Sequence, residues 1–371
     1  MTTRFKFTIF CLLCTAIWAK AQSFENSLEA FCDSVHEANP SSVGIMVHVE
    51  SPQRNISFST ASGVSSKDVR TDLNPDQPAL LASNTKTFVS AAILRLVEMG
   101  RLSVDDPTGL LLSEKTRTLF EGGGYDLNAI KVKHLMSHTS GVRDYVDEEY
   151  INFVDQNQGY RWTRDEQLER SIAAGEPLGN PEYTFSYADA NYLLLTEIIE
   201  GITEKPFYTA MRELLRYEDL GLNNTWMPSL EEKPKQTKTL VYQYNESLGW
   251  DSYEVDVSAD LYGGGGIAST TSDLANFAYK LFHCEIVEDT TTFNLIYTKI
   301  PTQDTVPSHY GFGLTRYDVS GYTAYGHGGF WGTKVIYIPE LDTSIAVFVL
   351  ERDRRSLTSG IIDHIIGLLE D

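Results

Sequence analysis

Two kinds of hydrophobic pattern divide this chain into its ends and its middle. Residues 22–38 carry apolar side chains at helical spacing, and residues 43–49 and 56–63 predict two strands joined by a polar turn. Short apolar segments separated by turn residues return in the last third. They predict four strands and a closing helix, at 311–317, 322–327, 333–338, 344–350 and 357–369.

The middle of the chain predicts helices joined by long polar loops. An apolar run over 88–97 that closes with Gly100 predicts a helix with Ser83 on its first turn. Further helices are expected at 108–119, 130–137, 147–156, 164–174, 187–201, 205–215 and 272–282.

This order of elements predicts the fold class. We expect an α/β fold of the α+β kind, in which both chain ends build one antiparallel sheet flanked by helices. Residues 22–79 and 262–371 would form the sheet region, and residues 80–261 an inserted, mainly helical region of the same domain.

The N-terminus has the features of an export signal. Arg4 and Lys6 precede a short apolar run over 7–18, and Ala19 and Ala21 are small residues of the kind a signal peptidase reads. We expect residues 1–21 to be a signal peptide cleaved after Ala21, which predicts a secreted or periplasmic protein. The apolar run is too short to span a bilayer comfortably, so no stable membrane insertion is expected after cleavage.

Composition narrows the classes of partner. The net charge is −21, from 51 acidic and 30 basic residues, so nucleic acids and anionic membranes are poor partners. The charge pattern leaves the oligomeric state open. After cleavage only Cys32 and Cys284 would remain, and two unpaired thiols are favoured over a disulfide.

The sequence predicts neither a metal site nor a cofactor. His134 and His138 are four residues apart on an expected helix, but no Glu follows His134 as it does in a zinc-protease motif. We therefore interpret these histidines as structural.

Ser83 and Lys86 form the only Ser-x-x-Lys pattern in the chain. Residues three apart share one helix face, so the hydroxyl and the amine would lie side by side, as an activated serine nucleophile requires. A helix cap followed by a solvated lysine would give the same four letters. The pattern alone does not decide between these interpretations.

Two further segments carry candidate chemistry. Tyr187 precedes an apolar helical run, and a phenol beside the Lys86 ammonium would have a depressed pKa and act as a base. The alternative is a buried structural tyrosine. His327, Gly328 and Gly329 come just before a strand, where glycines let a substrate approach backbone N–H groups. A tight hairpin with an incidental histidine explains them equally well.

Taken together, these segments resemble the serine β-lactamase-related superfamily of class C β-lactamases, D-alanyl-D-alanine carboxypeptidases and esterase-like serine hydrolases. Its Ser-x-x-Lys, Tyr-x-Asn and Lys/His-x-Gly motifs correspond, in this order, to Ser83–Lys86, Tyr187–Asp189 and His327–Gly329. Intervening segments also match, including Leu135-Met136-Ser137-His138-Thr139-Ser140-Gly141 and Tyr310-Gly311-Phe312-Gly313. The likeness runs from about residue 43 to 350 and implies a β-lactamase/transpeptidase-like fold.

The resemblance also implies roles. Ser83 would attack a carbonyl and carry the acyl group, with Lys86 and Tyr187 sharing the proton transfers. The backbone N–H groups of Ser83 and Phe330 would form the oxyanion hole. Asp189, His327, Gly328 and Gly329 would line the substrate site, where His327 could steer a carboxylate.

Two departures from the motifs bear on the substrate. Asp189 replaces the usual Asn, and a carboxylate would pair with Lys86 and hold it charged, which shifts the work of the base toward Tyr187. His327 replaces the usual Lys and is largely neutral at pH 7, so carboxylate anchoring should be weaker. We expect a secreted serine hydrolase acting on an ester or amide, including D-amino-acid peptides. A true β-lactamase or D,D-carboxypeptidase is one alternative, and a catalytically weak ligand-binding member of the fold is another.

Overall fold

The computed structural model describes residues 22–304 and 309–370. The expected signal peptide over residues 1–21 lies outside the described residues, and its cleavage after Ala21 stays a prediction. The described part begins with a helix over 22–38, close to the predicted bounds.

One six-stranded antiparallel sheet joins the two ends of the chain, as predicted. Its strand order is β2-β1-β10-β9-β8-β7. β1 pairs with β10 from Ile45↔Val349 to Glu50↔Ser344, so a strand near the N-terminus lies inside the sheet, beside the strand nearest the C-terminus. The strands are β1 (Gly44–Ser51), β2 (Ile56–Gly63), β7 (Thr315–Val319), β8 (Tyr322–Gly328), β9 (Thr333–Ile338) and β10 (Thr343–Val349).

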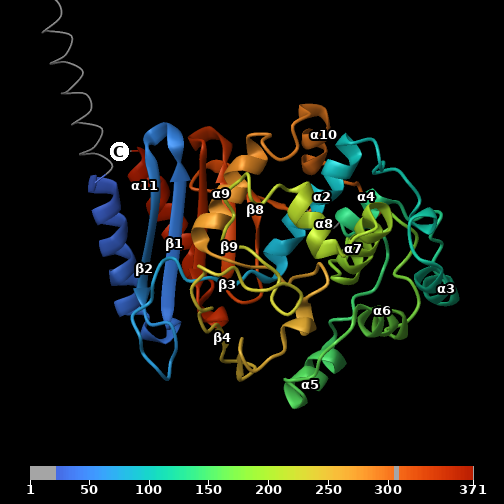
Figure 1. Cartoon of the computed structure of the whole chain (residues 1–371), viewed down its shortest axis with the longest axis horizontal. Helices are drawn as coiled ribbons and strands as arrows, with labels where there is room; N and C mark the ends of the chain where they lie inside the picture. Colours follow the sequence, from blue (N-terminus) through green and yellow to red (C-terminus); the bar gives the residue numbers. More distant parts are fainter. Residues whose placement is uncertain (1–21, 305–308, 371) are drawn as a thin grey trace, which may run out of the picture.

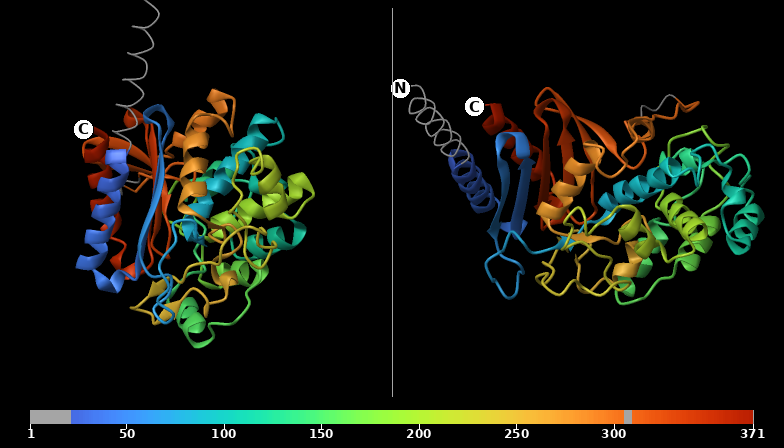
Figure 2. Two further views of the ribbon diagram at one scale, coloured as in Figure 1. Left: turned by 60° about the vertical axis from the view of Figure 1, so that its left-hand side comes forward. Right: turned by 45° about the horizontal axis from the view of Figure 1, so that its top comes forward.

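Helices cover both faces of this sheet. The helix over 22–38 and α11 (Leu357–Glu370) lie side by side on one face, and α9 (Thr271–Phe282) lies on the other (Figures 1 and 2). Side chains alternate between the faces along a strand, so Ile45 and Val47 pack toward the 22–38 helix and α11 while Met46 joins the core shared with the helical region.

The remaining helices form a second body beside α9 (Figure 1). α2 is buried along most of its length and contacts α7 and α8, so the segment after Ser83 is a core helix. The helices are α2 (Thr85–Glu98), α3 (Glu114–Gly122), α4 (Val132–Met136), α5 (Glu148–Gln156), α6 (Arg164–Ala173), α7 (Ala190–Thr203), α8 (Phe207–Leu214) and α10 (Thr290–Asn294). Two short antiparallel strand pairs complete it: β3 (Ala79–Leu80) with β6 (Ala268–Ser269), and the hairpin of β4 (Tyr244–Asn245) with β5 (Trp250–Asp251).

Three predicted boundaries were wrong. The helix expected at 108–119 begins at Glu114, because Ser113 accepts a hydrogen bond from the Thr116 N–H and caps it. The helix expected from 187 begins at Ala190, which leaves Tyr187 outside it. The strand expected from 311 begins at Thr315, because Gly313 turns the chain with a φ of 73°.

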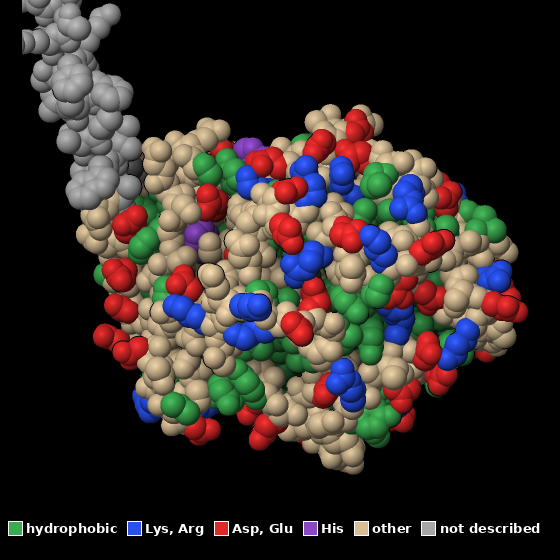
Figure 3. All heavy atoms as spheres, in the orientation of Figure 1, with side chains coloured by type: hydrophobic (Ala, Val, Ile, Leu, Met, Phe, Trp, Pro, Cys, Tyr) green, Lys and Arg blue, Asp and Glu red, His purple; other side chains and the backbone are tan. Residues whose placement is uncertain are grey.

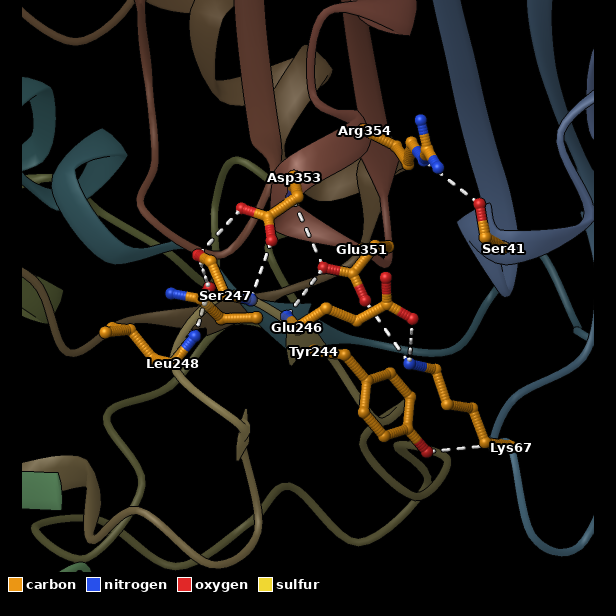
Figure 4. A network of polar contacts seen from close by, with 10 residues as sticks. Ser41, Lys67, Tyr244, Glu246, Ser247, Leu248, Glu351, Asp353 and Arg354 are labelled. Carbon is orange, nitrogen blue, oxygen red and sulfur yellow. Dashed lines mark hydrogen bonds and ion pairs between the residues drawn. The ribbon is translucent and has the colours of Figure 1, made fainter.

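A polar network anchors the β4–β5 hairpin to the end of β10 (Figure 4). The Lys67 ammonium lies 3.3 Å from the fully buried Glu351 carboxylate and 3.1 Å from Glu246. The Ser247 N–H donates to Asp353 over 2.8 Å. The hairpin carries Trp250 on β5, which lines the cavity described below and donates from its indole N–H to Asp155 over 2.9 Å.

Cys32 and Cys284 are both free thiols, in agreement with the favoured interpretation. Across residues 22–304 and 309–370, no helix combines the length and the apolar character needed to cross a bilayer. On the face seen in Figure 3, acidic and basic side chains are interspersed, and the basic ones do not gather into one patch.

Candidate active site

Ser83 lies in a single 3₁₀ turn, Ala82–Asn84, that leads directly into α2. Ala82 has a φ of 47°, a left-handed conformation that a residue with a Cβ adopts only when its surroundings impose it. From Ala79 to Leu94 every residue is buried except Ser83, which is partly exposed. The turn therefore presents the Ser83 hydroxyl to solvent from within a buried segment.

Lys86 is fully buried, and its ammonium group has three partners. Nζ donates to Ser83 Oγ over 3.1 Å, lies 2.6 Å from Asp189 Oδ1, and donates to the Gly264 carbonyl. An ammonium has three N–H donors, so these contacts use all of them. Burial lowers the pKa of Lys86, but the negative charges of Asp189 and, less strongly, Asp260 raise it by more. The lysine is therefore held in its charged form, as the Asp189 substitution predicted.

Tyr187 lies before α7, with its ring 4.9 Å from the Lys86 ammonium and 4.2 Å from the His138 ring. About 37 % of the residue is exposed, on the side that lines the cavities. Removal of water from the hydroxyl raises the pKa of Tyr187, and the Lys86 charge lowers it by less. The expectation of a depressed phenol pKa is therefore wrong, because desolvation outweighs the ammonium.

His138 holds the segment that carries Tyr187. Its Nδ1 accepts hydrogen bonds from the Ala188 N–H and the Asn191 side-chain amide, each over 3.2 Å. Burial, with the Lys86 charge, depresses the pKa of His138 well below its usual range. A neutral, buried imidazole with these partners supports the structural interpretation of this residue.

His327 is neutral, and both of its ring nitrogens are engaged. A carbonyl can only accept, so Nδ1 donates to Gly328 O over 2.7 Å and Nε2 accepts from the Tyr310 hydroxyl over 3.0 Å. Burial, with a contribution from Lys86, lowers the pKa of His327 to about 4. The imidazole has no N–H left for a substrate, so the expectation that it would steer a carboxylate is not supported.

Gly329 brings the end of β8 against the Ser83 turn. A Cβ at this position would lie 2.1 Å from Leu81 O and 2.3 Å from Thr333 Oγ1, so only glycine fits. The Thr333 hydroxyl in turn donates to Leu81 O and accepts from the Asn84 amide, each over 2.9 Å. These contacts fix Phe330, the next residue, relative to Ser83. The oxyanion hole formed by their two N–H groups stays a prediction.

Asp144 and Asp260 are site residues that our sequence reasoning did not single out. The Asp189 N–H donates to Asp144 Oδ1 over 2.9 Å. A Cβ on Gly265 would lie 2.2 Å from Asp260 Oδ2, so the glycine-rich loop packs directly on Asp260. Burial and the Asp189 charge raise the pKa of Asp144 well above its usual range and that of Asp260 to about 8. The sequence held one signal for each residue. Asp144 comes just after the Ser140-Gly141 turn, and Asp260 comes just before four consecutive glycines.

Two cavities meet at Ser83 and Tyr187. One, of about 300 Å³, has mainly apolar walls and is lined by Asp144, Asp189 and Asp260. The other, of about 580 Å³, is more open and runs along His327, Gly328 and Gly329 to Lys334 and Arg355. The structure therefore brings all the predicted site residues together, with acidic groups on one side of Ser83 and basic groups on the other. No group of three or more metal-binding side chains lies close enough, in the part of the chain described, to hold a metal ion.

A partly exposed serine at the start of a buried helix, with a lysine three residues on and a tyrosine beside it, is the arrangement expected of a serine hydrolase. The Beta-lactamase family profile matches residues 43–357, and the chain belongs to this family of serine hydrolases.

Known relatives are distant. Penicillin-binding protein 4 of Amycolatopsis lactamdurans is 24 % identical over 83 % of this chain and 81 % of its own length. Penicillin-binding protein 4* of Bacillus subtilis is 21 % identical over 71 % of this chain, and the chain spans only 58 % of that protein. A D-amino acid amidase from Ochrobactrum anthropi has the same fold, with a TM-score of 0.77 at 19 % identity, covering 93 % of this chain and 98 % of its own.

Proposed function

We propose that this protein is a secreted hydrolase that forms an acyl-enzyme on Ser83 with an ester or amide substrate, including D-amino-acid peptides. The observation that carries the proposal is the 3.1 Å hydrogen bond from Lys86 Nζ to Ser83 Oγ at the junction of the two cavities. In acylation the Ser83 oxygen bonds to the substrate carbonyl and the alcohol or amine leaves. In deacylation a water oxygen bonds to the same carbonyl carbon, the bond to Ser83 Oγ breaks, and the acid leaves as the Ser83 hydroxyl takes back a proton.

Tyr187 is the residue that we assign to proton transfer. Lys86 is charged and has no lone pair to accept a proton, and the Tyr187 phenol is neutral because its pKa is raised. A neutral phenol can accept the Ser83 proton while it passes its own proton to the leaving group, so no phenolate has to accumulate. Lys86 would then position Ser83 and stabilise the negative charge that develops, with Asp189 keeping it charged.

Chemical labelling tests the nucleophile. The protein is treated with a fluorophosphonate and digested, and the adduct is located by mass spectrometry. We expect one adduct, on Ser83, that is lost in Ser83→Ala. Folded protein without an adduct at Ser83 would refute the proposal. Stoichiometric labelling without turnover of any ester or D-amino-acid amide would favour the ligand-binding alternative.

D,D-carboxypeptidase or β-lactamase activity is the second candidate. The basic side chains of Lys334 and Arg355 in the open cavity favour it, because they could hold a substrate carboxylate that His327 cannot. The names of the penicillin-binding relatives agree with this candidate. Hydrolysis of a chromogenic cephalosporin, or release of D-alanine from a peptide ending in D-alanyl-D-alanine, would distinguish it.

The proposed secretion rests on residues 1–21 alone. Expression of the full chain in a bacterial host, followed by intact-mass measurement of the exported protein, should give a chain that begins at Gln22. Retention of Met1 in the cytoplasmic fraction would contradict it.

A further inference from the structure

The smaller cavity at Ser83 combines apolar walls with more acidic groups than the protein pairs with cations. Asp144, Asp189, Asp256 and Asp260 all line it, beside Ser83 and Tyr187. Its apolar walls come from α5, from β5 and from the segment after β8. The wall residues are Val146, Tyr150, Ile151, Val154, Trp250 and Phe330.

Only one of the four carboxyl groups has a positive partner. Lys86 pairs with Asp189, and its other donors are taken by Ser83 and Gly264. Among the described residues, Asp144, Asp256 and Asp260 make no salt bridge, so the pocket holds three acidic groups without a cation. Burial of an unpaired carboxylate is costly, which is why Asp144 and Asp260 favour their protonated forms.

Unsatisfied polar atoms mark the same place. Asp260 Oδ1 is buried and has no hydrogen-bond partner among the described residues. The Tyr145 hydroxyl is also without one in this part of the chain, although Tyr145 is only 1 % exposed. The charges of Asp189, Asp260 and Asp144 act on this hydroxyl, and the Tyr145 ring packs 5.1 Å from that of Tyr150 in the cavity wall. Buried polar groups are nearly always satisfied, so these atoms mark the pocket as a place where a polar group of a ligand can bind.

A cation with several N–H donors suits this set of acceptors. The four aspartates do not converge tightly enough to hold a metal ion, as far as the described residues show. A primary ammonium has three donors that can reach separate acceptors, and the apolar walls suit a hydrophobic substituent next to it. The opposite cavity carries the basic residues, so a cationic group favours the acidic side of Ser83.

We propose that this cavity binds the acyl part of the substrate as an aminoacyl group, with its free ammonium held by Asp260 and Asp144 and its bulky apolar side chain against Trp250. This inference rests on the proposed function, since it names the substrate class of the same site. The substrates would be amides or esters of hydrophobic amino acids with an unblocked amino group.

Matched substrates test the inference. The purified protein is assayed with the D and L enantiomers of phenylalanine p-nitroanilide and with two neutral analogues. These are the N-acetyl derivative of each enantiomer and 3-phenylpropanoyl p-nitroanilide, which lacks the amino group. We expect kcat/KM for one free-amine substrate to exceed that of both neutral analogues at least tenfold. Neutral analogues that are cleaved as well or better would overturn the proposal.

Two variants test whether Asp260 binds the substrate ammonium. Asp260→Asn should lower the ratio of kcat/KM between the free-amine substrate and 3-phenylpropanoyl p-nitroanilide at least tenfold. Asp251→Asn is the matched control, because Asp251 does not line the cavity and its carboxylate accepts the Tyr253 N–H over 2.8 Å, a role an amide oxygen can fill. Asp251→Asn should leave the ratio unchanged. An unchanged ratio in Asp260→Asn would contradict the assignment.

Protection of the native protein from labelling gives a test that needs neither variant nor turnover. Phenethylamine should slow fluorophosphonate labelling of Ser83 at a concentration at least tenfold below that of 2-phenylethanol, which has the same ring and no charge at that position. Equal protection by the two would overturn the inference while the labelling itself upheld Ser83 as the nucleophile. Absence of labelling would instead refute the proposed function.

Discussion

The Lys86 ammonium and the Asp189 carboxylate lie 2.6 Å apart in a buried ion pair beside Ser83. The pair exists because Asp189 replaces a neutral amide of the family motif, and it leaves the lysine charged. The consequence for the proposed mechanism is that the charged Lys86 does not act as a free-amine base, and we assign the proton transfers to the neutral phenol of Tyr187.

Asp189→Asn tests that relationship. Without the carboxylate, burial should lower the pKa of Lys86, so that the lysine loses its proton within the range of an assay. We expect a new ionisation below about pH 10, the usual lysine value, in the pH profile of Ser83 labelling. An identical profile in the variant and the native protein would show that Asp189 does not control the charge of Lys86.

Tyr187→Phe should reduce the acylation rate by on the order of a hundredfold, because it removes the proton-transferring hydroxyl and keeps the ring against His138. Stopped-flow measurement of acylation with a p-nitrophenyl ester gives the rate. Tyr183→Phe is the control, since Tyr183 is 49 % exposed and close in sequence. Rates near the native value in Tyr187→Phe would exclude the phenol from the mechanism.

Gly329→Ala should impair catalysis through geometry alone. The added methyl group would meet Leu81 O at 2.1 Å and push β8 away from the Ser83 turn, which would displace the Phe330 N–H. Loss of one oxyanion donor costs on the order of a hundredfold in kcat. Gly159→Ala, where a Cβ meets nothing within 4 Å, should change neither kcat nor thermal stability. A fully active Gly329→Ala would argue against the predicted oxyanion hole.

Stability should fall with rising pH because of Asp260. The folded protein raises the pKa of this carboxyl to about 8, mainly by burial and then through the Asp189 charge, while Lys86 opposes the shift. Between the unfolded value near 4 and about 8, the folded state binds the extra proton, so its stabilising effect is present at low pH and is lost as pH rises toward 8.

Asp260→Asn should remove this dependence. We expect the melting temperature of the variant relative to the native protein to be higher at pH 8 than at pH 5, by roughly 2 °C or more. Differential scanning fluorimetry at both pH values measures it, with Asp251→Asn as the control. A difference that does not vary with pH would show that Asp260 is ionised in the native protein throughout.

Local pattern was sufficient for much of the fold. The strands at 56–63 and 333–338 and the helix over 22–38 follow from alternation and helical spacing, which depend on nearby residues only. Boundaries such as those of α7 and β7 could not be read in this way. They depend on Asp189 facing Lys86 and on Gly313 packing against Ser90, contacts between segments far apart in the chain.

The sequence by itself determined the candidate nucleophile and its partners, because the motifs around Ser83, Tyr187 and His327 are each local and their order is readable. Only the tertiary structure decided their charge states. The pKa of a side chain depends on burial and on charges brought close by folding, so the neutral His327, the protonated phenol of Tyr187 and the unpaired Asp260 emerge only when distant segments surround them.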